Sequence, residues 1–366
     1  MINRRVFLQS SLLAMANSQV FAALKQNKLE AAEAVLTEAT KSGLITSACL
    51  FVQQRDKAFQ QKFGAAKSVD DIYLLASITK PICITAVMKL YDQGEFNLDD
   101  AAVKFLPEFI GDGREKITIR QLMTHVSGLP DQLPENAQLR SSHAPLSEFV
   151  KGAMRTPLLF PPGTKYNYSS MAILLATEIG MRISGKPIEE LVQQNVFDPL
   201  GMRHSALGQG EFPLESLTPV QVEHAAPESG AGDPSTKEWD WNSPYWRKLG
   251  APWGTAHGSA ADVGRFLDEF LHPSDRAVKP ETAKIMISNQ NPPGIHPRGI
   301  GFDLGEQCGG DGCSSQTFGH GGSTGTLCWA DPATETICVV LTTLPGSAVT
   351  PHPREIVSDL VAEAAG

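Results

Sequence analysis

The sequence predicts an α/β protein of the α+β type, with an antiparallel sheet flanked by helices and an inserted, mostly helical domain. Two strand-like segments, Ser47–Gln54 and Lys57–Gly64, lie near the start of the chain, and four more lie between residues 299 and 343. The intervening residues 98–208 show mainly helical patterns of apolar residues. Since both chain ends supply strands, we expect them to build one sheet, with the helical part inserted between them.

This order of elements divides the chain into three parts. Residues 23–95 and 240–366 are expected to form the sheet domain, residues 96–239 the mostly helical inserted domain, and residues 1–22 an export signal. Ligand sites favour the interfaces between domains, so a cleft at this boundary is the expected place for a site.

Helices are expected around the strands. Residues 28–42 carry an apolar stripe at helical spacing that ends at Gly43. Residues 77–93 are expected to form a buried helix, residues 259–272 a further helix, and residues 354–365 the helix that closes the chain. The four later strands are expected at residues 299–305, 316–319, 325–331 and 336–343.

Composition limits the classes of partner. The chain has 366 residues, 42% of them hydrophobic, which suits two domains or one large composite domain. Its net charge of −9 argues against nucleic acid or an anionic membrane surface as partner. No apolar run reaches the length needed to cross a bilayer, so no transmembrane segment is expected.

The first residues have the pattern of a targeting segment. The string Asn3-Arg4-Arg5-Val6-Phe7-Leu8-Gln9 resembles the twin-arginine export signal of bacteria. A modestly apolar stretch follows, and Val20-Phe21-Ala22 offers a small-residue cleavage pattern. We therefore expect a periplasmic or secreted protein, with a cytoplasmic protein that begins with a basic helix as the alternative.

The chain has six cysteines, and two of them suggest a link. Cys308 and Cys313 flank a glycine-rich loop that could close a disulfide in an oxidising compartment, and free buried thiols are the alternative. A zinc site made of these two cysteines and His320 is not expected, because the spacing matches no common pattern. We expect neither a metal nor a cofactor.

The most informative motif is Ser77-Ile78-Thr79-Lys80 at the start of the expected buried helix. Residues three apart lie on one helical face, so the hydroxyl of Ser77 and the amine of Lys80 meet at the first turn. The helix start favours negative charge on the serine oxygen, and a lysine in a dry cleft has a lowered pKa. Ser77 is therefore a candidate nucleophile with Lys80 as its base. A serine cap beside an exposed lysine is the alternative.

Two further strings strengthen the first interpretation. They are Tyr168-Ser169-Ser170 and His320-Gly321-Gly322. With Ser77-Ile78-Thr79-Lys80, in this order and at these separations, they resemble the serine β-lactamase and penicillin-binding-protein superfamily, most closely the class C branch and the carboxylesterases related to it. Residues 117–129, 197–202 and 254–263 also look like that family, and the resemblance runs from about Leu29 to Leu344.

The resemblance implies a β-lactamase/transpeptidase-like fold and a division of labour in acyl transfer. Ser77 would attack the carbonyl, Lys80 would take its proton, and Tyr168 would pass a proton to the leaving group. For that role the pKa of Tyr168 must fall, and a neighbouring Lys80 ammonium favours the phenolate. The backbone N–H groups of Ser77 and Ser323 would form the oxyanion hole.

Departures from the family pattern point toward an esterase. Ser170 stands where members often carry asparagine, and its hydroxyl is expected to bind a ligand or Lys80. His320 replaces the usual lysine of Lys-Thr-Gly and is expected to be only partly charged at pH 7. Both changes weaken the case for carboxylate-bearing lactams. Ser170, His320, Gly321 and Gly322 are therefore expected to bind substrate.

Other assignments were weighed for the remaining motifs. Residues 321–325 match the G-x-S-x-G nucleophile elbow, but a hairpin follows and His352 is the sole later histidine, so Ser323 is not the expected nucleophile. His125 is assigned no catalytic role. The irregular segment 213–250 contains Trp239, Trp241 and Trp246, which are expected either to line an acyl pocket or to anchor the loop.

These observations together predict a serine hydrolase that works through an acyl-enzyme, most simply a carboxylesterase on short-chain esters. The alternatives are a β-lactamase or D-Ala-D-Ala carboxypeptidase with the same reacting groups, and a non-catalytic penicillin-sensing or scaffolding domain. The expected partner is a small-molecule ester or amide. The sequence does not determine the physiological substrate or the oligomeric state.

Overall fold

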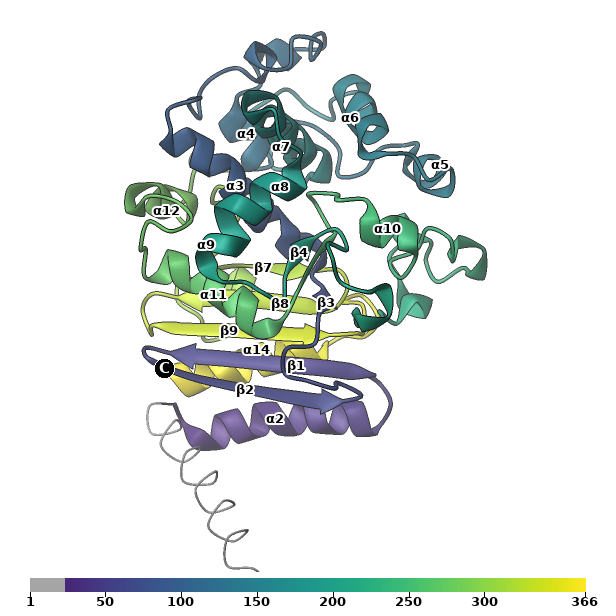
Figure 1. Cartoon of the computed structure of the whole chain (residues 1–366). Coiled ribbons are helices and arrows are strands. Elements are labelled where there is room, and N and C mark those ends of the chain that lie inside the picture. The colour runs from purple at the N-terminus through teal and green to yellow at the C-terminus, as the bar shows by residue number, and fades with distance from the viewer. Residues whose placement is uncertain (1–23) are drawn as a thin grey trace, which may run out of the picture.

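The computed structural model describes residues 24–366, so the expected export signal at residues 1–22 lies outside the described residues. Its main sheet is antiparallel and has the strand order β2-β1-β9-β8-β7-β6 (Figure 1). These strands are β1 (Ser47–Gln54), β2 (Lys57–Gly64), β6 (Asp303–Leu304), β7 (Phe318–Gly322), β8 (Thr326–Asp331) and β9 (Thr336–Thr342). Since β1 pairs with β9, both ends of the chain build this sheet, as the sequence predicts.

The sheet separates two hydrophobic cores. Helices α2 (Gln26–Lys41) and α14 (Pro353–Ala365) cover one face, and α11 (Ala260–Leu271) covers the other (Figure 1). Along β1, Leu50 and Val52 belong to the core under α2 and α14, whereas Phe51 between them belongs to the core under α11. This alternation follows from the two-residue period of a strand and explains why β1 is buried on both faces.

The helical part of the chain lies beyond the α11 side of the sheet and surrounds a central helix, α3 (Thr79–Asp92) (Figure 1). Eleven of the fourteen residues of α3 are buried, which is the pattern of a helix enclosed on all sides. The remaining helices are α4 (Ile119–Met123), α5 (Asn136–Ser141), α6 (Leu146–Arg155), α7 (Ser170–Ser184), α8 (Ile188–Val192), α9 (Asp198–Leu200), α10 (Pro244–Lys248), α12 (Pro280–Met286) and α13 (Glu306–Gly309).

A small second sheet connects distant parts of the chain. It has the order β3-β5-β4, where β3 is Tyr73–Leu74, β4 is Ala206–Leu207 and β5 is Ala256–Gly258. The sequence did not indicate it, because strands of two or three residues carry too little pattern. Strand β3 immediately precedes the turn with Ser77, so this sheet fixes the approach of the chain to that residue.

Most expected elements are present, and one is largely absent. The strand expected at residues 299–305 shortens to β6, because Gly301 has a φ of +83° and the N–H of Gly299 bonds the carbonyl of Phe302 in a tight turn. The chain around Ser77 begins as a short 3-10 turn, Ala76–Ile78, and continues as α3. The division into domains at residues 96 and 239 stays a prediction, and β4 pairs across it with β5.

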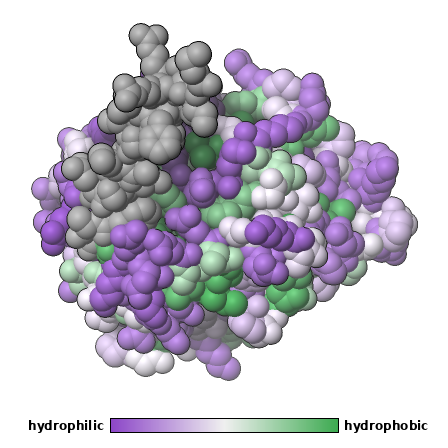
Figure 2. All heavy atoms as spheres, turned by 90° about the horizontal axis from the view of Figure 1, so that it is seen from below, coloured by the Kyte–Doolittle hydropathy of each residue, from purple (hydrophilic) through white to green (hydrophobic). Residues whose placement is uncertain are grey.

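The surface and the helices bear on possible contacts with membranes. Within residues 24–366 no helix combines the length and the apolar character that crossing a bilayer requires. The face seen from the α2 side is mostly hydrophilic, and small apolar areas between polar residues break it up (Figure 2). The large exposed apolar side chains, Leu44, Ile110 and Leu159, lie far apart in the sequence.

Candidate active site

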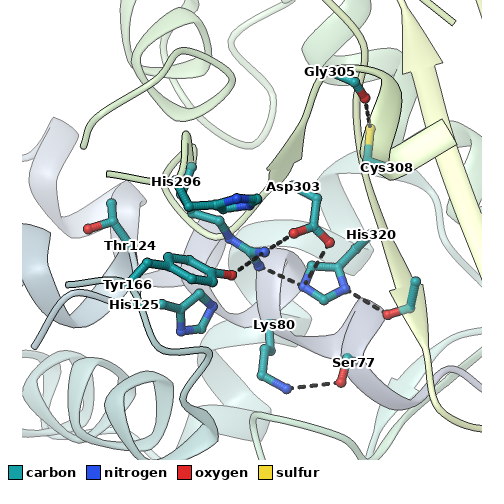
Figure 3. Close-up of polar contacts among 12 residues, drawn as sticks. Ser77, Lys80, Thr124, His125, Tyr166, His296, Asp303, Gly305, Cys308 and His320 are labelled. Carbon is teal, nitrogen blue, oxygen red and sulfur yellow. Dashed lines mark hydrogen bonds and ion pairs between the residues drawn. The ribbon is translucent and has the colours of Figure 1, made fainter. Parts of the chain in front are cut away.

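Ser77 and Lys80 meet at the start of α3. The Nζ atom of Lys80 lies 3.0 Å from the Oγ of Ser77 and 3.0 Å from the backbone carbonyl of Trp253, and the first of these bonds is drawn in Figure 3. The preceding residue, Ala76, has a φ of +48°, in the left-handed region that non-glycine residues rarely adopt. This conformation turns the chain sharply before the helix and leaves Ser77 partly exposed beside the buried Lys80.

The environment of Lys80 prepares its amine to act as a base. Burial lowers the pKa of Lys80 from its usual range to about 7, and the nearby carboxylate of Asp131 opposes that change. The charge of Arg298 lowers the pKa further. A substantial fraction of Lys80 is therefore neutral near pH 7, and a neutral amine can accept the proton of Ser77.

Tyr168 lies next to this pair but does not have the lowered pKa expected from the sequence. It precedes α7, and its ring centroid is 4.7 Å from the Nζ of Lys80. Burial raises the pKa of Tyr168 above its usual value, and the opposing effects of Arg298 and of the Ser77 hydroxyl are smaller. The expected phenolate is therefore wrong for the free protein. Because Lys80 is the group with the lowered pKa, the phenol of Tyr168 stays a proton donor.

The hairpin of β7 and β8 lies against the turn that carries Ser77. A side chain at Gly322 would come within 2.5 Å of the carbonyl oxygen of Leu75, so only glycine permits this approach. The hydroxyl of Thr326 donates to the same carbonyl at 2.9 Å, and the hydroxyl of Thr324 donates to the carbonyl of Leu74 at 2.6 Å. These bonds connect the hairpin to the residues just before the nucleophile.

Ser323 lies at the end of β7 and faces the same pocket as Ser77. Its carbonyl accepts from the N–H of Gly346 at 3.0 Å, while its own N–H has no acceptor within residues 24–366. An unpaired N–H beside the nucleophile is what an oxyanion hole requires. The hydroxyl of Ser323 has no base beside it, because the amine of Lys80 bonds Ser77.

His320 is neutral and is paired with an arginine that the sequence did not indicate. Arg298 donates to the Nε2 of His320 at 2.8 Å, so the Nδ1–H of His320 donates to the carbonyl of Gly321 at 2.7 Å. Burial, together with the charge of Arg298, holds the pKa of His320 well below its usual range. The expectation of a partly charged His320 is therefore wrong. The local cation is Arg298, which forms an ion pair with Asp303 (Figure 3 labels Asp303 beside His320).

Ser170 does not bind Lys80, contrary to one of the two expected roles. Its hydroxyl donates to Asp131 at 2.6 Å, and its backbone N–H donates to the same carboxylate oxygen at 2.8 Å. Ser170 is the first residue of α7, so Asp131 accepts from the free N–H groups at that helix end. The side chain of Ser170 still borders the pocket.

A pocket of about 240 Å³ opens in front of Ser77, and we call it the acyl pocket. Trp241 and Trp246 line it as expected, but Trp239 does not, and Trp253 supplies the third ring. Local spacing could not separate these tryptophans, because the irregular chain between them has no fixed period. The acyl pocket is lined by Ala76, Ser77, Asp131, Gln132, Arg140, Tyr168, Ser170, Glu228, Trp241, Trp246, Trp253, Gly254 and Ser323.

A second cavity of about 450 Å³ lies on the other side of Tyr168 and His320. Its charged lining includes the cations Arg298 and Arg354 and the carboxylates Asp303, Glu355 and Asp359. Gly321 also borders this cavity, whereas Gly322 contacts the turn before Ser77 rather than a cavity. Cys308 contributes to the same wall, and it and Cys313 are free buried thiols.

His125 supports the position of Tyr168. Its ring centroid lies 4.6 Å from that of Tyr168, and its Nδ1 accepts from the N–H of Ser169 at 3.1 Å. Sequence reasoning gave His125 no catalytic role, and these contacts make it a neighbour that holds the tyrosine. Asp131, Glu228 and Arg298 were also missed, since each lies far along the chain from the motif that it serves.

Comparison with known proteins places this geometry in a family. The Beta-lactamase family matches residues 32–363. A protein of Escherichia coli (strain K12) named as a D-alanyl-D-alanine carboxypeptidase is 25% identical over 355 residues, covering 82% of this chain and 78% of that protein. Esterase EstB of Burkholderia gladioli is 36% identical over 157 residues, covering 38% of this chain and 39% of that esterase.

A solved structure agrees with the fold. The crystal structure of a novel penicillin-binding protein homolog from Caulobacter crescentus superposes with a TM-score of 0.74 at 19% identity, covering 93% of this chain and 98% of that one. The fold and the site thus define a serine hydrolase of the β-lactamase and penicillin-binding-protein superfamily. Since the match spans nearly all described residues, the chain belongs to the Beta-lactamase family.

Proposed function

We propose that this protein is a carboxylesterase that hydrolyses short-chain esters through an acyl-enzyme on Ser77. The observation that carries the proposal is the 3.0 Å contact between the Oγ of Ser77 and the Nζ of Lys80, whose pKa burial lowers to about 7. A base that is neutral at the working pH and in contact with the hydroxyl is what nucleophilic catalysis needs. The acyl pocket of about 240 Å³ suits a small acyl group.

The steps follow from the positions of these groups. Neutral Lys80 accepts the proton of Ser77 as its oxygen attacks the ester carbonyl, and the N–H groups of Ser77 and Ser323 stabilise the negative oxygen. One such donor contributes roughly 2.7–4 kcal/mol to the barrier in comparable enzymes. Collapse then expels the alcohol, which takes a proton from Lys80 or, through the phenol, from Tyr168. A water molecule attacks the acyl-enzyme in the same way and releases the acid.

The charges near His320 support esters over carboxylate-bearing substrates. Arg298 is the cation at this position, but Asp303 already pairs with it. Three carboxylates and two arginines line the second cavity, so a further carboxylate would meet net negative charge there. An ester with an uncharged alcohol avoids this repulsion.

A D-Ala-D-Ala carboxypeptidase is the second candidate. It is supported by the carboxypeptidase name of the Escherichia coli relative and by Arg298 beside the site. A β-lactamase would need the same reacting groups. A non-catalytic sensing domain is disfavoured by the contact between Ser77 and Lys80, which an enzyme needs and a scaffold does not.

A substrate comparison tests the proposal. The purified protein is assayed in parallel with p-nitrophenyl acetate and butyrate, a chromogenic cephalosporin and a D-Ala-D-Ala peptide. We expect kcat/KM for the esters to exceed the other values by at least about tenfold. Comparable or higher values for the cephalosporin or the peptide would reject the esterase assignment.

We also propose that residues 1–22 direct export to the periplasm or beyond. The support is the string Asn3 to Gln9 with its paired arginines. Fusing residues 1–22 to a reporter that works only after twin-arginine export tests this. Export that persists when both Arg4 and Arg5 are changed to lysine would contradict it.

A further inference from the structure

The acyl pocket contains two carboxylates, and one of them has no partner. Asp131 accepts both of its close hydrogen bonds from the uncharged Ser170. The side chain of Glu228 forms no hydrogen bond and no ion pair with any residue of the described range 24–366, and it borders the pocket. An unpaired carboxylate beside a substrate site is costly unless water or a ligand group meets it.

The rest of the wall is aromatic. The rings of Trp246 and Trp253 are both buried and lie 6.2 Å apart in an edge-to-face arrangement, and Trp241 completes this side. Indole rings attract cations through their negative faces, and tryptophan is the strongest of the aromatic residues in this respect. Aromatic faces combined with carboxylates form a site for a substituted ammonium rather than for an anion.

One cation, Arg140, already lies in this wall and does not cancel both carboxylates. Its guanidinium carbon is 3.8 Å from the ring centroid of Trp246. Its nitrogens donate to Asn136 and Ser229, each at 3.1 Å, and within residues 24–366 it forms no ion pair with Glu228 or Asp131. The lining therefore holds two carboxylates against one guanidinium and an amine, Lys80, that is partly neutral.

We propose that the acyl pocket selects substrates whose acyl group ends in a positively charged amine or quaternary ammonium, which Glu228, Asp131 and the tryptophan rings would receive. This inference rests on the proposed acyl-enzyme function, because it names the class of acyl group that Ser77 would take up. A neutral acyl group of equal size fills the same space but leaves Glu228 unpaired. An anionic acyl group meets two carboxylates.

A pair of isosteric esters tests the selection. The esters are p-nitrophenyl 4-(trimethylammonio)butanoate and p-nitrophenyl 5,5-dimethylhexanoate, which differ in charge but hardly in shape. We expect kcat/KM to favour the cationic ester by about tenfold in the natural protein. The variant Glu228→Gln should lower this ratio at least about fivefold. Any change in the reactivity of Ser77 or Lys80 affects both esters and cancels in the ratio.

Glu223→Gln is the matched control. Glu223 lies in the same irregular segment and is exposed, and it does not border the acyl pocket. The substitution removes the same charge and should leave the ratio unchanged. Equal kcat/KM for the two esters, a preference for the neutral one, or the same ratio in the natural protein and Glu228→Gln would overturn the proposal.

A binding measurement separates this proposal from the catalytic one. Tryptophan fluorescence is titrated with tetramethylammonium and, in parallel, with tert-butanol, because tryptophans line the pocket. We expect a saturable change with the cation alone, and at least about fivefold weaker binding in Glu228→Gln. If the cation binds in this way but neither ester is hydrolysed, the esterase function fails and the cation site stands. If esters are hydrolysed but no saturable change occurs, the cation site fails alone.

Discussion

The reacting groups and the walls of the acyl pocket are held by different kinds of contact. Ser77 lies between a regular helix and a β-hairpin, and backbone carbonyls before it accept hydroxyl bonds from Thr324 and Thr326. The tryptophan wall belongs to residues 213–253, a segment of short turns that side chains hold together. For example, Arg247 donates to the carbonyl of Trp241 at 2.9 Å.

This difference separates chemistry from selection. The contacts around Ser77 leave no room for change, since backbone atoms approach one another across Gly322. The wall depends on side chains of an irregular loop, and loops accept substitution more easily than packed strands do. We therefore expect substitutions near Ser77 to remove activity and substitutions in the wall to change the preferred acyl group.

Removing the nucleophile should have the largest effect. Ser77→Ala should lower ester turnover by about 10⁴-fold or more, because only binding and the oxyanion hole would remain. It should also abolish covalent labelling by a fluorophosphonate. Ser323→Ala keeps its backbone N–H and should retain labelling and most activity. Labelling of Ser323 in the Ser77→Ala protein would refute the assignment.

Adding one methyl group at Gly322 should cost roughly a hundredfold in kcat. Its Cβ would meet the carbonyl of Leu75 at 2.5 Å and displace β7 from the turn with Ser77. Gly321→Ala is the control, since its nearest atom would be Leu327 Cδ1 at 3.8 Å, and we expect a loss below about tenfold. Steady-state kinetics measures both, and circular dichroism must show intact folds. Equal losses in the two variants would contradict the argument from close approach.

The activity should rise with pH through about 7, the pKa that burial gives Lys80. The neutral amine is the active form, so protonation below this pH removes the base. The neutral fraction implies that kcat/KM at pH 6 is about a tenth of its value at pH 8. A pH–rate profile for p-nitrophenyl butyrate measures this. A profile that is flat over that range, or that falls with rising pH, would exclude Lys80 as the base.

The smallest effect is expected in the wall. Trp241→Leu enlarges the acyl pocket, so the ratio of kcat/KM for p-nitrophenyl hexanoate over acetate should rise about threefold to tenfold. The pH profile should stay unchanged, because Trp241 does not contact Lys80 in the described structure. An unchanged ratio with a fully folded protein would show that Trp241 does not limit acyl length.

The sequence by itself determined the local parts of this protein. Ser77 and Lys80 meet because residues three apart on a helix always lie on one face. The strands Ser47–Gln54 and Lys57–Gly64 occur where alternation and turn residues predict them. The resemblance of three short motifs also indicated the family. Each of these features depends on residues that are close in the chain or on motifs that can be recognised one by one.

Only the tertiary structure decided the electrostatics and the shape of the pocket. Burial lowers the pKa of Lys80 and raises that of Tyr168, and burial is a property of the whole fold. Arg298 reaches His320, and Glu228 reaches the acyl pocket, only because segments remote in the chain pack together. Trp253 replaces Trp239 in the wall for the same reason. No repeating pattern connects such residues, so their spacing in the sequence carries no signal of their contact.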